Sequence, residues 1–397
     1  MEHYGFLEPE QRERLFFKRP VAFTAESDKK LLATALGGTL YIPCTRPNLA
    51  EDVRKMAKRG ASSVVLCLED SIPDSSLPDA EINLKHALKE LAEADDSDTL
   101  PLIFVRVRTP RHLRHVSDMN GINLKVLTGF VFPKFDNSNG SASEYMFILR
   151  NTNEFLAENG VKRPLYFMPV IESPSVAYRE LRKGVLAGIK GVLDQNKDIM
   201  LAVRIGATDI SSVYGLRRPR DFTVYDVHVV ASVLADIVNL FGRANDDYVI
   251  SGPVWEHFIS GERLLKPQLR DSLFSNENRE IRRELLVEGY DSFIKEISLD
   301  RANGFTGKTI IHPSHIPLVH ALSVVTHEEY SDAITITSEE NETGGATSSA
   351  YKNKMNEIKP HLAWAKKTLL RAQAFGVSNP DVDFVDFLEV EYERMAR

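Results

Sequence analysis

Eight short apolar runs, most of them followed by a stretch with helical spacing, constrain the fold of this chain more than any other feature. They lie at residues 39–43, 63–68, 102–107, 129–132, 165–171, 200–205, 248–250 and 309–311. The runs are β-branched and continuously apolar, which is typical of parallel strands buried on both faces. Eight such strands alternating with helices predict an α/β fold, a (β/α)₈ TIM barrel. An open doubly wound sheet is the alternative, but no G-x-G-x-x-G motif follows the first run.

Three regions fall outside this repeat. Residues 1–36 are expected to form a polar N-terminal extension, and the barrel domain is expected to span residues 37–330. An insertion at about 255–306 separates the last two strands, and its charged stretch has the spacing of an amphipathic helix.

The third region, residues 331–397, begins with a polar loop. Residues 335–350 are rich in Gly, Ser and Thr and predict a flexible lid or a solvated linker. Residues 356–375 have helical spacing. We expect this C-terminal helical segment either to cover the barrel mouth or to pack on a neighbouring subunit.

Composition excludes several classes of partner. The net charge of −7 over 397 residues gives no basic footprint for nucleic acid. No apolar run is long enough to span a bilayer, so no membrane partner is expected. The charged first twenty residues lack the apolar stretch of a signal peptide, which predicts a cytoplasmic location.

Charged residues collect where the predicted strands end. They are Arg46, Glu69, Asp70, Arg106, Arg108, Lys134, Glu172, Arg204, Asp209 and His312. In a TIM barrel, the carboxyl ends of the strands carry the chemistry. We therefore expect these side chains to converge on one mouth.

Glu172 and Asp209 follow adjacent predicted strands and could bind one hard cation together. Mg²⁺ prefers oxygen ligands and often takes only one or two protein carboxylates, with water and substrate filling the other positions. Mn²⁺ is an alternative at the same oxygen ligands. A different interpretation is that each carboxylate caps the helix that follows it.

The arginines near the third strand end have two interpretations. Arg106 and Arg108 differ by two positions, so on a strand they would point the same way. An arginine in the mouth could bind a substrate carboxylate or stabilise an enolate. It could instead form a structural ion pair with Glu69 or Asp70. Those two carboxylates could also orient metal-bound water or accept a proton.

The remaining candidate site residues also have more than one possible role. Lys134 could hold a phosphate or carboxylate, or form a Schiff base. His312 is a candidate acid or base, although a single histidine at a strand end is often structural. Arg217 and Arg218 could bind a phosphorylated substrate, or belong to a solvated basic loop.

Seven motifs along residues 37–325 resemble the citrate lyase β-subunit and HpcH/HpaI aldolase superfamily, in the order of that family. They are LYIPCTRP, VVLCLEDSIPD, FVRVRT, VFPKF, PVIESPSV, RIGATDIS and GKTIIHPSHI. The resemblance implies that Glu172 and Asp209 are the Mg²⁺ ligands, that Arg46 and Arg106 match family arginines, and that the chain forms trimers or hexamers.

Departures from the family pattern point to a separate branch. Thr208 replaces the glutamate before Asp209, and VISGPVWEHF lacks the usual acidic residue of the seventh strand. The segments GLRRPRDFTVYDVHVV and GPVWEHF are similar to TIM-barrel carbon–carbon bond lyases from tellurium-resistance-associated gene neighbourhoods, which are associated with biosynthesis. Citrate and an acyl carrier protein are therefore not carried over.

These observations predict a Mg²⁺-dependent carbon–carbon lyase or aldolase acting on a small hydroxy- or oxo-carboxylate. A coenzyme A ester or a phosphorylated metabolite is left open as the substrate. Arg106 would stabilise the enolate, and Glu69, Asp70 or His312 would act as the base. The alternatives are a thioesterase that uses the same metal site and a non-catalytic barrel that binds a metabolite.

Overall fold

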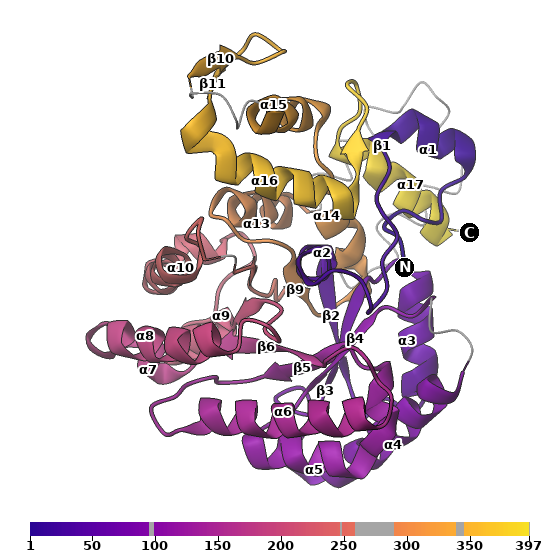
Figure 1. Ribbon diagram of the computed structural model, residues 1–397, viewed down its shortest axis with the longest axis vertical. Helices are drawn as coiled ribbons and strands as arrows, with labels where there is room; N and C mark the ends of the chain where they lie inside the picture. Colours follow the sequence, from indigo (N-terminus) through magenta and orange to yellow (C-terminus); the bar gives the residue numbers. More distant parts are fainter. Residues whose placement is uncertain (95–98, 247, 259–289, 339–344, 397) are drawn as a thin grey trace.

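The computed structural model describes residues 1–94, 99–246, 248–258, 290–338 and 345–396 (Figure 1). Its main sheet has eight parallel strands in the order β8-β7-β6-β5-β4-β3-β2-β9. The strands are β2 (Gly38–Pro43), β3 (Ser63–Cys67), β4 (Leu102–Arg106), β5 (Gly129–Phe132), β6 (Tyr166–Ile171), β7 (Val203–Ile205), β8 (Ile250–Ser251) and β9 (Lys308–Ile310). A parallel bridge between Gly252 and Lys308 joins the two outer strands. The predicted α/β barrel is thereby confirmed, since the sheet closes on itself.

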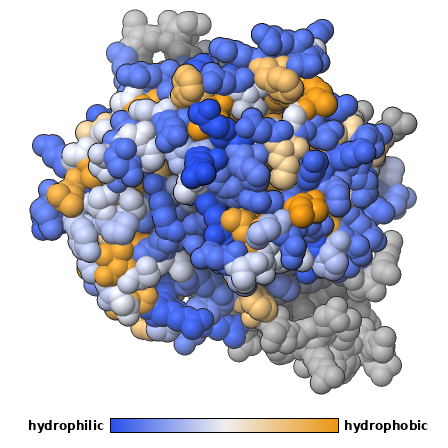
Figure 2. Space-filling model, turned by 90° about the horizontal axis from the view of Figure 1, so that it is seen from below, coloured by the Kyte–Doolittle hydropathy of each residue, from blue (hydrophilic) through white to orange (hydrophobic). Residues whose placement is uncertain are grey.

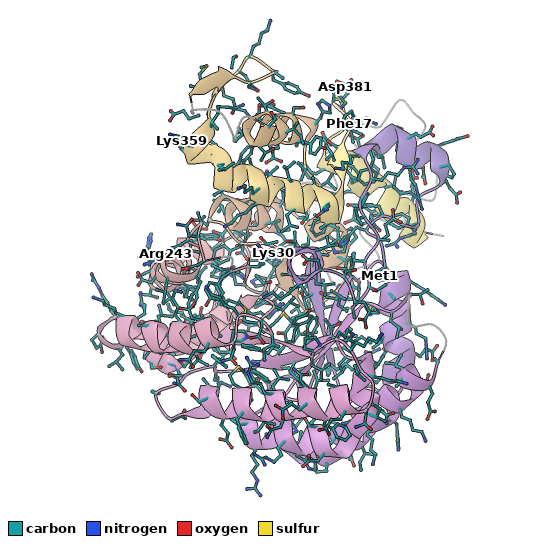
Figure 3. The ribbon with its side chains drawn as sticks, in the orientation of Figure 1. Met1, Phe17, Lys30, Arg243, Lys359 and Asp381 are labelled. Atoms are coloured by element: carbon teal, nitrogen blue, oxygen red, sulfur yellow. The ribbon has the colours of Figure 1, made fainter. Side chains whose placement is uncertain are left out.

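Helices surround this barrel, as the alternating pattern predicts. They are α3 (Leu49–Lys58), α4 (Leu77–Glu93), α5 (Pro110–Asn120), α6 (Ser141–Glu158), α7 (Pro174–Ala177), α8 (Arg179–Gln195), α9 (Ala207–Ser212), α10 (His228–Phe241), α13 (Asp291–Ala302) and α14 (Ile316–Ala321). Each longer helix buries an apolar stripe, for example Leu49, Val53 and Met56 of α3. Side chains fill the interior of the barrel and the layer between strands and helices (Figure 3).

The N-terminal residues close the amino-terminal end of the barrel. Asp28 caps α2 (Lys29–Ala35) by accepting hydrogen bonds from the amides of Lys30 and Leu31. Leu32 of α2 is buried in one cluster with Phe104, whose side chain lies inside the barrel. We expected only a polar extension here and did not predict that it closes the barrel. A few buried leucines, such as Leu31 and Leu32, are enough to pack a short helix against the barrel. Before α2 come α1 (Pro9–Leu15) and β1 (Phe16–Lys18).

The C-terminal segments lie at the same end. They are α15 (His327–Ser338), β10 (Ala346–Ser348), β11 (Met355–Glu357), α16 (Ile358–Phe375), β12 (Val377–Ser378) and α17 (Phe384–Ala396). Helix α16 packs on α2 (Figure 1), and the ring of Phe375 lies 4.2 Å from that of His3. The expectation that this helix covers the mouth is therefore wrong. Strand β12 pairs with β1, which joins the two ends of the chain.

Two predicted irregular regions are partly ordered. The polar loop predicted at 335–350 is wrong at both ends, because Thr335–Ser338 complete α15 and Ala346–Ser348 form β10. Residues 339–344 lie outside the described residues. In the insertion at 255–306, residues 259–289 also lie outside them. The predicted charged helix, residues 277–297, falls mostly on that part, and its last residues, 291–297, belong to α13. No helix in the described ranges is both long and apolar enough to cross a membrane.

Candidate active site

Six charged side chains from five consecutive strand ends meet at the mouth. They are Glu69 and Asp70 after β3, Arg106 at the end of β4, Lys134 after β5, Glu172 after β6 and Asp209 in α9 after β7. Arg106, Glu172 and Asp209 line one cavity of about 380 Å³. The convergence predicted from the strand order is therefore present for these residues.

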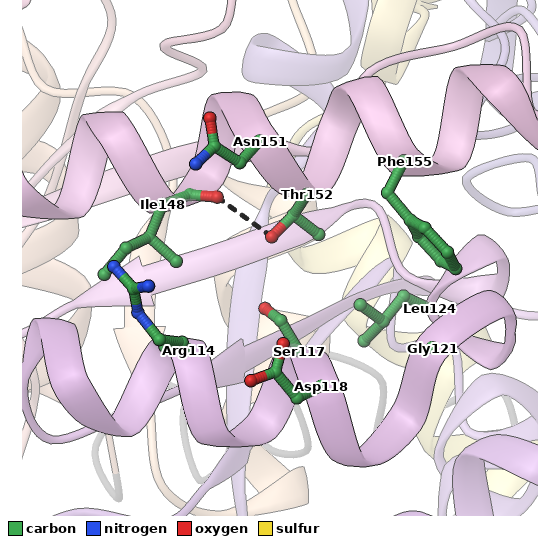
Figure 4. A pocket seen from close by; sticks show the side chains of 9 residues that line it. All are labelled: Arg114, Ser117, Asp118, Gly121, Leu124, Ile148, Asn151, Thr152 and Phe155. Atoms are coloured by element: carbon green, nitrogen blue, oxygen red, sulfur yellow. Dashed lines mark hydrogen bonds between the residues drawn. The ribbon is translucent and has the colours of Figure 1, made fainter.

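A second cavity, of about 410 Å³, lies away from the mouth, between α5 and α6 (Figure 4). Its wall includes Arg114 and Asp118 of α5 and Asn151 and Phe155 of α6. The outer face of α4, α5 and α6 is mostly hydrophilic, with apolar side chains scattered over it (Figure 2). Arg114 and Asp118 are the two charged residues of this wall, whereas the mouth cavity is lined by five, so we place the chemistry at the mouth.

Glu172 is the most buried acid at the mouth, with its side chain only 2% exposed. Its Oε1 accepts a hydrogen bond from Arg106 Nη2 at 2.9 Å and one from the backbone amide of Lys134 at 3.0 Å. Burial raises the pKa of Glu172 to about 7; Arg106 opposes this rise and the charge of Asp209 adds to it. Lys134 has φ +46°, a left-handed conformation uncommon for lysine, while its amide points at Glu172.

Gly206 makes room for this carboxylate. A Cβ atom at position 206 would lie 2.0 Å from Glu172 Oε2 and 2.5 Å from its Cβ. Only glycine therefore allows the β7–α9 connection to pass so close to Glu172. This residue was not among the predicted site residues, although its place in RIGATD between a strand and an acid was a signal.

Asp209 lies in the first turn of α9 and lines the same cavity as Glu172, near enough for its charge to act on that carboxylate. Burial raises the pKa of Asp209, Lys134 opposes the rise and the charge of Asp70 adds to it. The cap position of α9 is Gly206 and that of α7 is Ser173, and neither helix has a side-chain cap. The interpretation of Glu172 and Asp209 as helix caps is thus wrong, because both carboxylates turn toward each other instead.

Arg106 connects the two sides of the cluster. Its Nη2 lies 2.8 Å from Glu69 Oε2, 2.9 Å from Glu172 Oε1 and 3.7 Å from Asp70 Oδ2. Burial alone would lower the pKa of Arg106, but the charges of Glu172 and Glu69 raise it instead. The guanidinium is therefore always charged, and it both forms the anticipated ion pair with Glu69 and faces the cavity.

Lys134 forms the outer edge of the cluster. Its Nζ donates to Glu69 Oε1 at 2.7 Å and to Asp70 Oδ2 at 3.5 Å, and lies 3.9 Å from Asp209 Oδ1. Burial opposes the change, but the hydrogen bond and charge of Glu69 raise the pKa of Lys134 overall. A Schiff base requires a neutral amine, so this environment argues against that role. Burial raises the pKa of Glu69, whereas Asp70 has a lowered pKa because its hydrogen bonds to Glu69 and Lys134 outweigh burial.

The carboxylates at the mouth outnumber the cations, since four carboxylates contact two cations and a third cation that lines the cavity, Arg204, forms no ion pair with any of them. The four carboxylates are Glu69, Asp70, Glu172 and Asp209, and the two cations are Arg106 and Lys134. The raised pKa values of three of these acids follow from burial together with this excess. In the described part of the chain, no three His, Cys, Asp or Glu side chains form a closed metal cage. Two carboxylate ligands with open positions fit Mg²⁺, which keeps water or substrate oxygens in its shell.

Several predicted site residues lie elsewhere. Arg46 is 55% exposed and forms an ion pair with Asp52. Because β4 ends at Arg106, Arg108 does not continue the strand, and it donates to the carbonyl of Leu68 and to Asp74. The expectation that Arg106 and Arg108 point the same way is therefore wrong. Neither Arg46 nor Arg108 lines the mouth cavity.

The candidates from later in the chain also lie outside that lining. Arg218 is buried in an ion pair with Glu296, which does not support binding of a phosphorylated substrate. Arg217 is exposed. The ring of His312 stacks on Phe258 at 4.8 Å, and its Nδ1 contacts Ser314 Oγ at 2.7 Å. Burial lowers the pKa of His312.

Arg204 lines the cavity, as expected from its place at a strand end. Sequence reasoning missed two further residues that line the cavity from inside the barrel, Tyr41 and Thr309. Polar side chains within otherwise apolar strands were the available signal, because both faces of such strands are buried.

The chain is similar to a known enzyme family and to solved structures. The model of a family described as "C-C_Bond_Lyase of the TIM-Barrel fold" matches residues 30–377. CitE from Mycobacterium tuberculosis, in complex with magnesium, acetoacetate and coenzyme A, has a TM-score of 0.53 at 20% identity, covering 86% of this chain and 99% of CitE. A citrate lyase from Burkholderia xenovorans LB400 has a TM-score of 0.58 at 16% identity, covering 89% and 95%. At these identities, both likenesses show the fold. No curated protein sequence is similar enough to count as a match.

Proposed function

Because this chain belongs to the family of carbon–carbon bond lyases with the TIM-barrel fold, we propose that it is a Mg²⁺-dependent lyase or aldolase acting on a small oxo- or hydroxy-carboxylate. One observation carries the proposal. The carboxylates of Glu172 and Asp209 line one cavity and interact electrostatically, in a mouth that has more carboxylates than cations. Such an arrangement is incomplete without a cation.

Glu172 and Asp209 would hold the metal. Bound there, Mg²⁺ would supply Lewis-acid polarisation of the substrate oxygen beside the cleaved bond. The magnesium and acetoacetate in the CitE complex agree with this choice of ion and of substrate class. The arrangement would also leave the backbone amide of Lys134 and the guanidinium of Arg106 to hold Glu172 in place.

Arg106 would stabilise negative charge on the substrate. Its guanidinium is 11% exposed and lines the cavity, so it offers donors to a carboxylate or a developing enolate. Protonated Lys134 would add a second positive charge at the rim. Both cations already pair with Glu69, so binding of an anionic substrate would compete with that carboxylate.

Proton transfer would fall to Glu69 or Asp70. Glu69 is the better candidate because its raised pKa brings it closer to neutral pH, where a general base works best. His312 is a weaker candidate, since its ring stacks on Phe258 and its Nδ1 contacts Ser314. Glu69, in contrast, contacts Arg106 and Lys134 of the mouth cluster. Glu69→Gln is expected to reduce turnover more than the affinity for substrate.

Product analysis tests the proposed reaction. The full chain is incubated with Mg²⁺ and a panel of oxo- and hydroxy-carboxylates and their coenzyme A esters, and the products are identified by mass spectrometry. The proposal expects two carbon fragments from one substrate, or their condensation, and expects Arg106→Met to abolish the reaction. Release of free coenzyme A with an intact carbon skeleton would instead indicate thioester hydrolysis and contradict the proposal.

A further inference from the structure

Arg204 is a buried cation that the proposed chemistry leaves unexplained. It lies in β7, its side chain points into the barrel, and the residue is 1% exposed. Its Nη1 donates to Thr39 Oγ1 at 3.2 Å, and its Nη2 donates to Thr309 Oγ1. The Nε atom has no hydrogen-bond partner among the described residues. Its partners in the part of the chain that the structure describes are therefore two neutral hydroxyls, the sulfur of Met168 at 3.9 Å and the ring of Tyr41.

The other buried cations are neutralised. Five arginines and lysines of the described residues are buried, and all except Arg204 form ion pairs with a carboxylate. The paired ones are Arg106 with Glu69 and Glu172, Arg182 with Asp236, Arg218 with Glu296, and Lys308 with Glu296 and Asp300. A buried charge without a counter-ion is costly, and a fold that keeps one usually has a use for it.

Tyr41 does not serve as the counter-ion. The guanidinium carbon of Arg204 lies 5.6 Å from the centre of the Tyr41 ring, and that of Arg106 lies 6.0 Å from the same ring. Burial raises the pKa of Tyr41, so its hydroxyl stays protonated. The Tyr41 ring thus lies near both Arg106, which carboxylates neutralise, and Arg204, which has no ion pair.

The position of Arg204 relates it to the proposed metal site. Arg204 pairs in register with Val170 of β6, two residues before Glu172. It therefore lies one layer deeper in the barrel than Glu172, and both line the same cavity. A ligand held by Glu172 and Asp209 at one end could reach Arg204 with its other end.

We propose that Arg204, with the hydroxyls of Thr309 and Tyr41, forms an anion-binding subsite at the floor of the mouth for a second anionic group of the substrate. This inference rests on the proposed function and narrows its substrate class to compounds with two anionic ends, a dicarboxylate or a phosphorylated carboxylate. A guanidinium suits either group, because its donors match planar and tetrahedral oxyanions in pairs.

Matched ligand pairs test the subsite by calorimetry in the presence of Mg²⁺. The pairs are malate with lactate, 2-oxoglutarate with 2-oxobutyrate, and 3-phosphoglycerate with glycerate. In at least one pair, the wild-type protein is expected to bind the doubly anionic member about tenfold or more tightly. Arg204→Met is expected to remove that preference and leave the affinity for the singly anionic member unchanged. Arg204→Lys is expected to retain part of it. The pair that shows the preference identifies the second anionic group that the subsite binds as a carboxylate or as a phosphate.

A purely structural role predicts a different pattern. If Arg204 only fills the barrel, Arg204→Met lowers the melting temperature and leaves ligand preference unchanged, which would overturn the proposal. A binding role predicts an equal or higher melting temperature, because the substitution removes a buried charge that has no ion pair. Should Arg204→Met fail to fold, Arg204→Gln and Arg204→Lys are compared in the same way. Absence of any preference in the wild-type protein would also overturn it.

Failure of the metal assignment remains distinguishable from failure of the subsite. Mg²⁺ affinity is titrated separately in the wild-type protein and in Arg204→Met, and the two are expected to be equal. Repeating the ligand pairs without Mg²⁺ shows whether the preference depends on Arg204 alone. If the wild-type protein binds no Mg²⁺ but still prefers the doubly anionic ligands, the metal assignment is refuted and the proposed subsite is not.

Discussion

Two buried charged clusters in this barrel differ in how their charges balance. Arg218 and Lys308 face Glu296 and Asp300, so that two cations meet two carboxylates. The backbone amide of Val224 and the hydroxyl of Tyr225 donate further hydrogen bonds to these acids. In the mouth cluster, four carboxylates instead contact two cations, and Arg204, a third cation that lines the cavity, forms no ion pair with them.

The difference separates a structural network from a binding site. A balanced and fully hydrogen-bonded cluster satisfies itself, and its members need no ligand. In the mouth cluster, burial and the charge of Asp209 raise the pKa of Glu172 to about 7, and in the balanced cluster burial raises the pKa of Asp300 to about 6. The excess of carboxylates, rather than a raised pKa, therefore distinguishes the mouth. The same types of side chain therefore stabilise the fold in one place and leave a position for a cation in the other.

The largest expected effect comes from breaking the balanced cluster. Lys308→Met leaves Glu296 and Asp300 buried with one cation fewer, which should lower the free energy of unfolding by about 3–5 kcal/mol. Urea denaturation measures it, and Lys89→Met, at an exposed ion pair, is the matched control with a change of about 0–1 kcal/mol. A loss below about 1 kcal/mol for Lys308→Met would show that the network is not structural.

Gly206→Ala should act on the mouth with little effect on the core. The new Cβ would collide with Glu172 Oε2 and displace the carboxylate. We expect Mg²⁺ affinity to fall by about 10- to 100-fold, the range typical of changes that misplace a ligand. Gly188→Ala in α8 is the control, because nothing lies within 4 Å of its Cβ position. Equal Mg²⁺ affinities in both variants, measured by calorimetry, would argue against Glu172 as a ligand.

The pKa of Glu172 predicts how stability depends on pH without metal. Because the folded-state pKa of about 7 lies above the ordinary value of 4.5, the folded protein binds the proton more tightly than the unfolded chain. Stability from this group is therefore present below about pH 4.5 and is lost as the pH rises to about 7.

We expect Glu172→Gln to reduce this loss of stability by about 1–3 kcal/mol between pH 5 and 8. The control is the wild-type protein with saturating Mg²⁺, in which the loss should also shrink. Denaturation series at both pH values provide the measurement. An identical pH dependence in wild type and Glu172→Gln, both without metal, would contradict the elevated pKa.

The smallest effect is expected at Arg46. It forms an exposed ion pair with Asp52, so Arg46→Gln should change the free energy of unfolding by only about 0–1 kcal/mol. Substrate affinity should also stay within about twofold of the wild type. A tenfold loss of substrate affinity would extend the site to Arg46, as the sequence pattern first suggested.

The sequence was sufficient for the barrel and for the carboxylates at its mouth. All eight strands could be predicted because continuous apolar runs report burial on both faces, which is a local property. Glu172, Asp209 and Arg106 followed from strand order, since parallel strands bring their carboxyl ends together.

The pairing of side chains could not be predicted in the same way. Arg218 looked like a basic loop residue, but its partner Glu296 lies 78 positions away on α13. Arg108 looked like a strand residue, but β4 ends two positions earlier. Arg204 was expected at the mouth, but its contacts with Thr39 and Thr309 join separate strands. The close approach of Gly206 to Glu172 does so too, and no local pattern encodes such contacts.

A Mg²⁺ titration by calorimetry tests the central claim most directly. It compares the wild-type protein, Glu172→Gln, Asp209→Asn and the control Asp74→Asn, whose carboxylate is 94% exposed. We expect the wild type and Asp74→Asn to bind one ion with equal affinity, and the other two variants to lose at least tenfold in affinity. Unchanged Mg²⁺ affinity in both Glu172→Gln and Asp209→Asn would contradict the account.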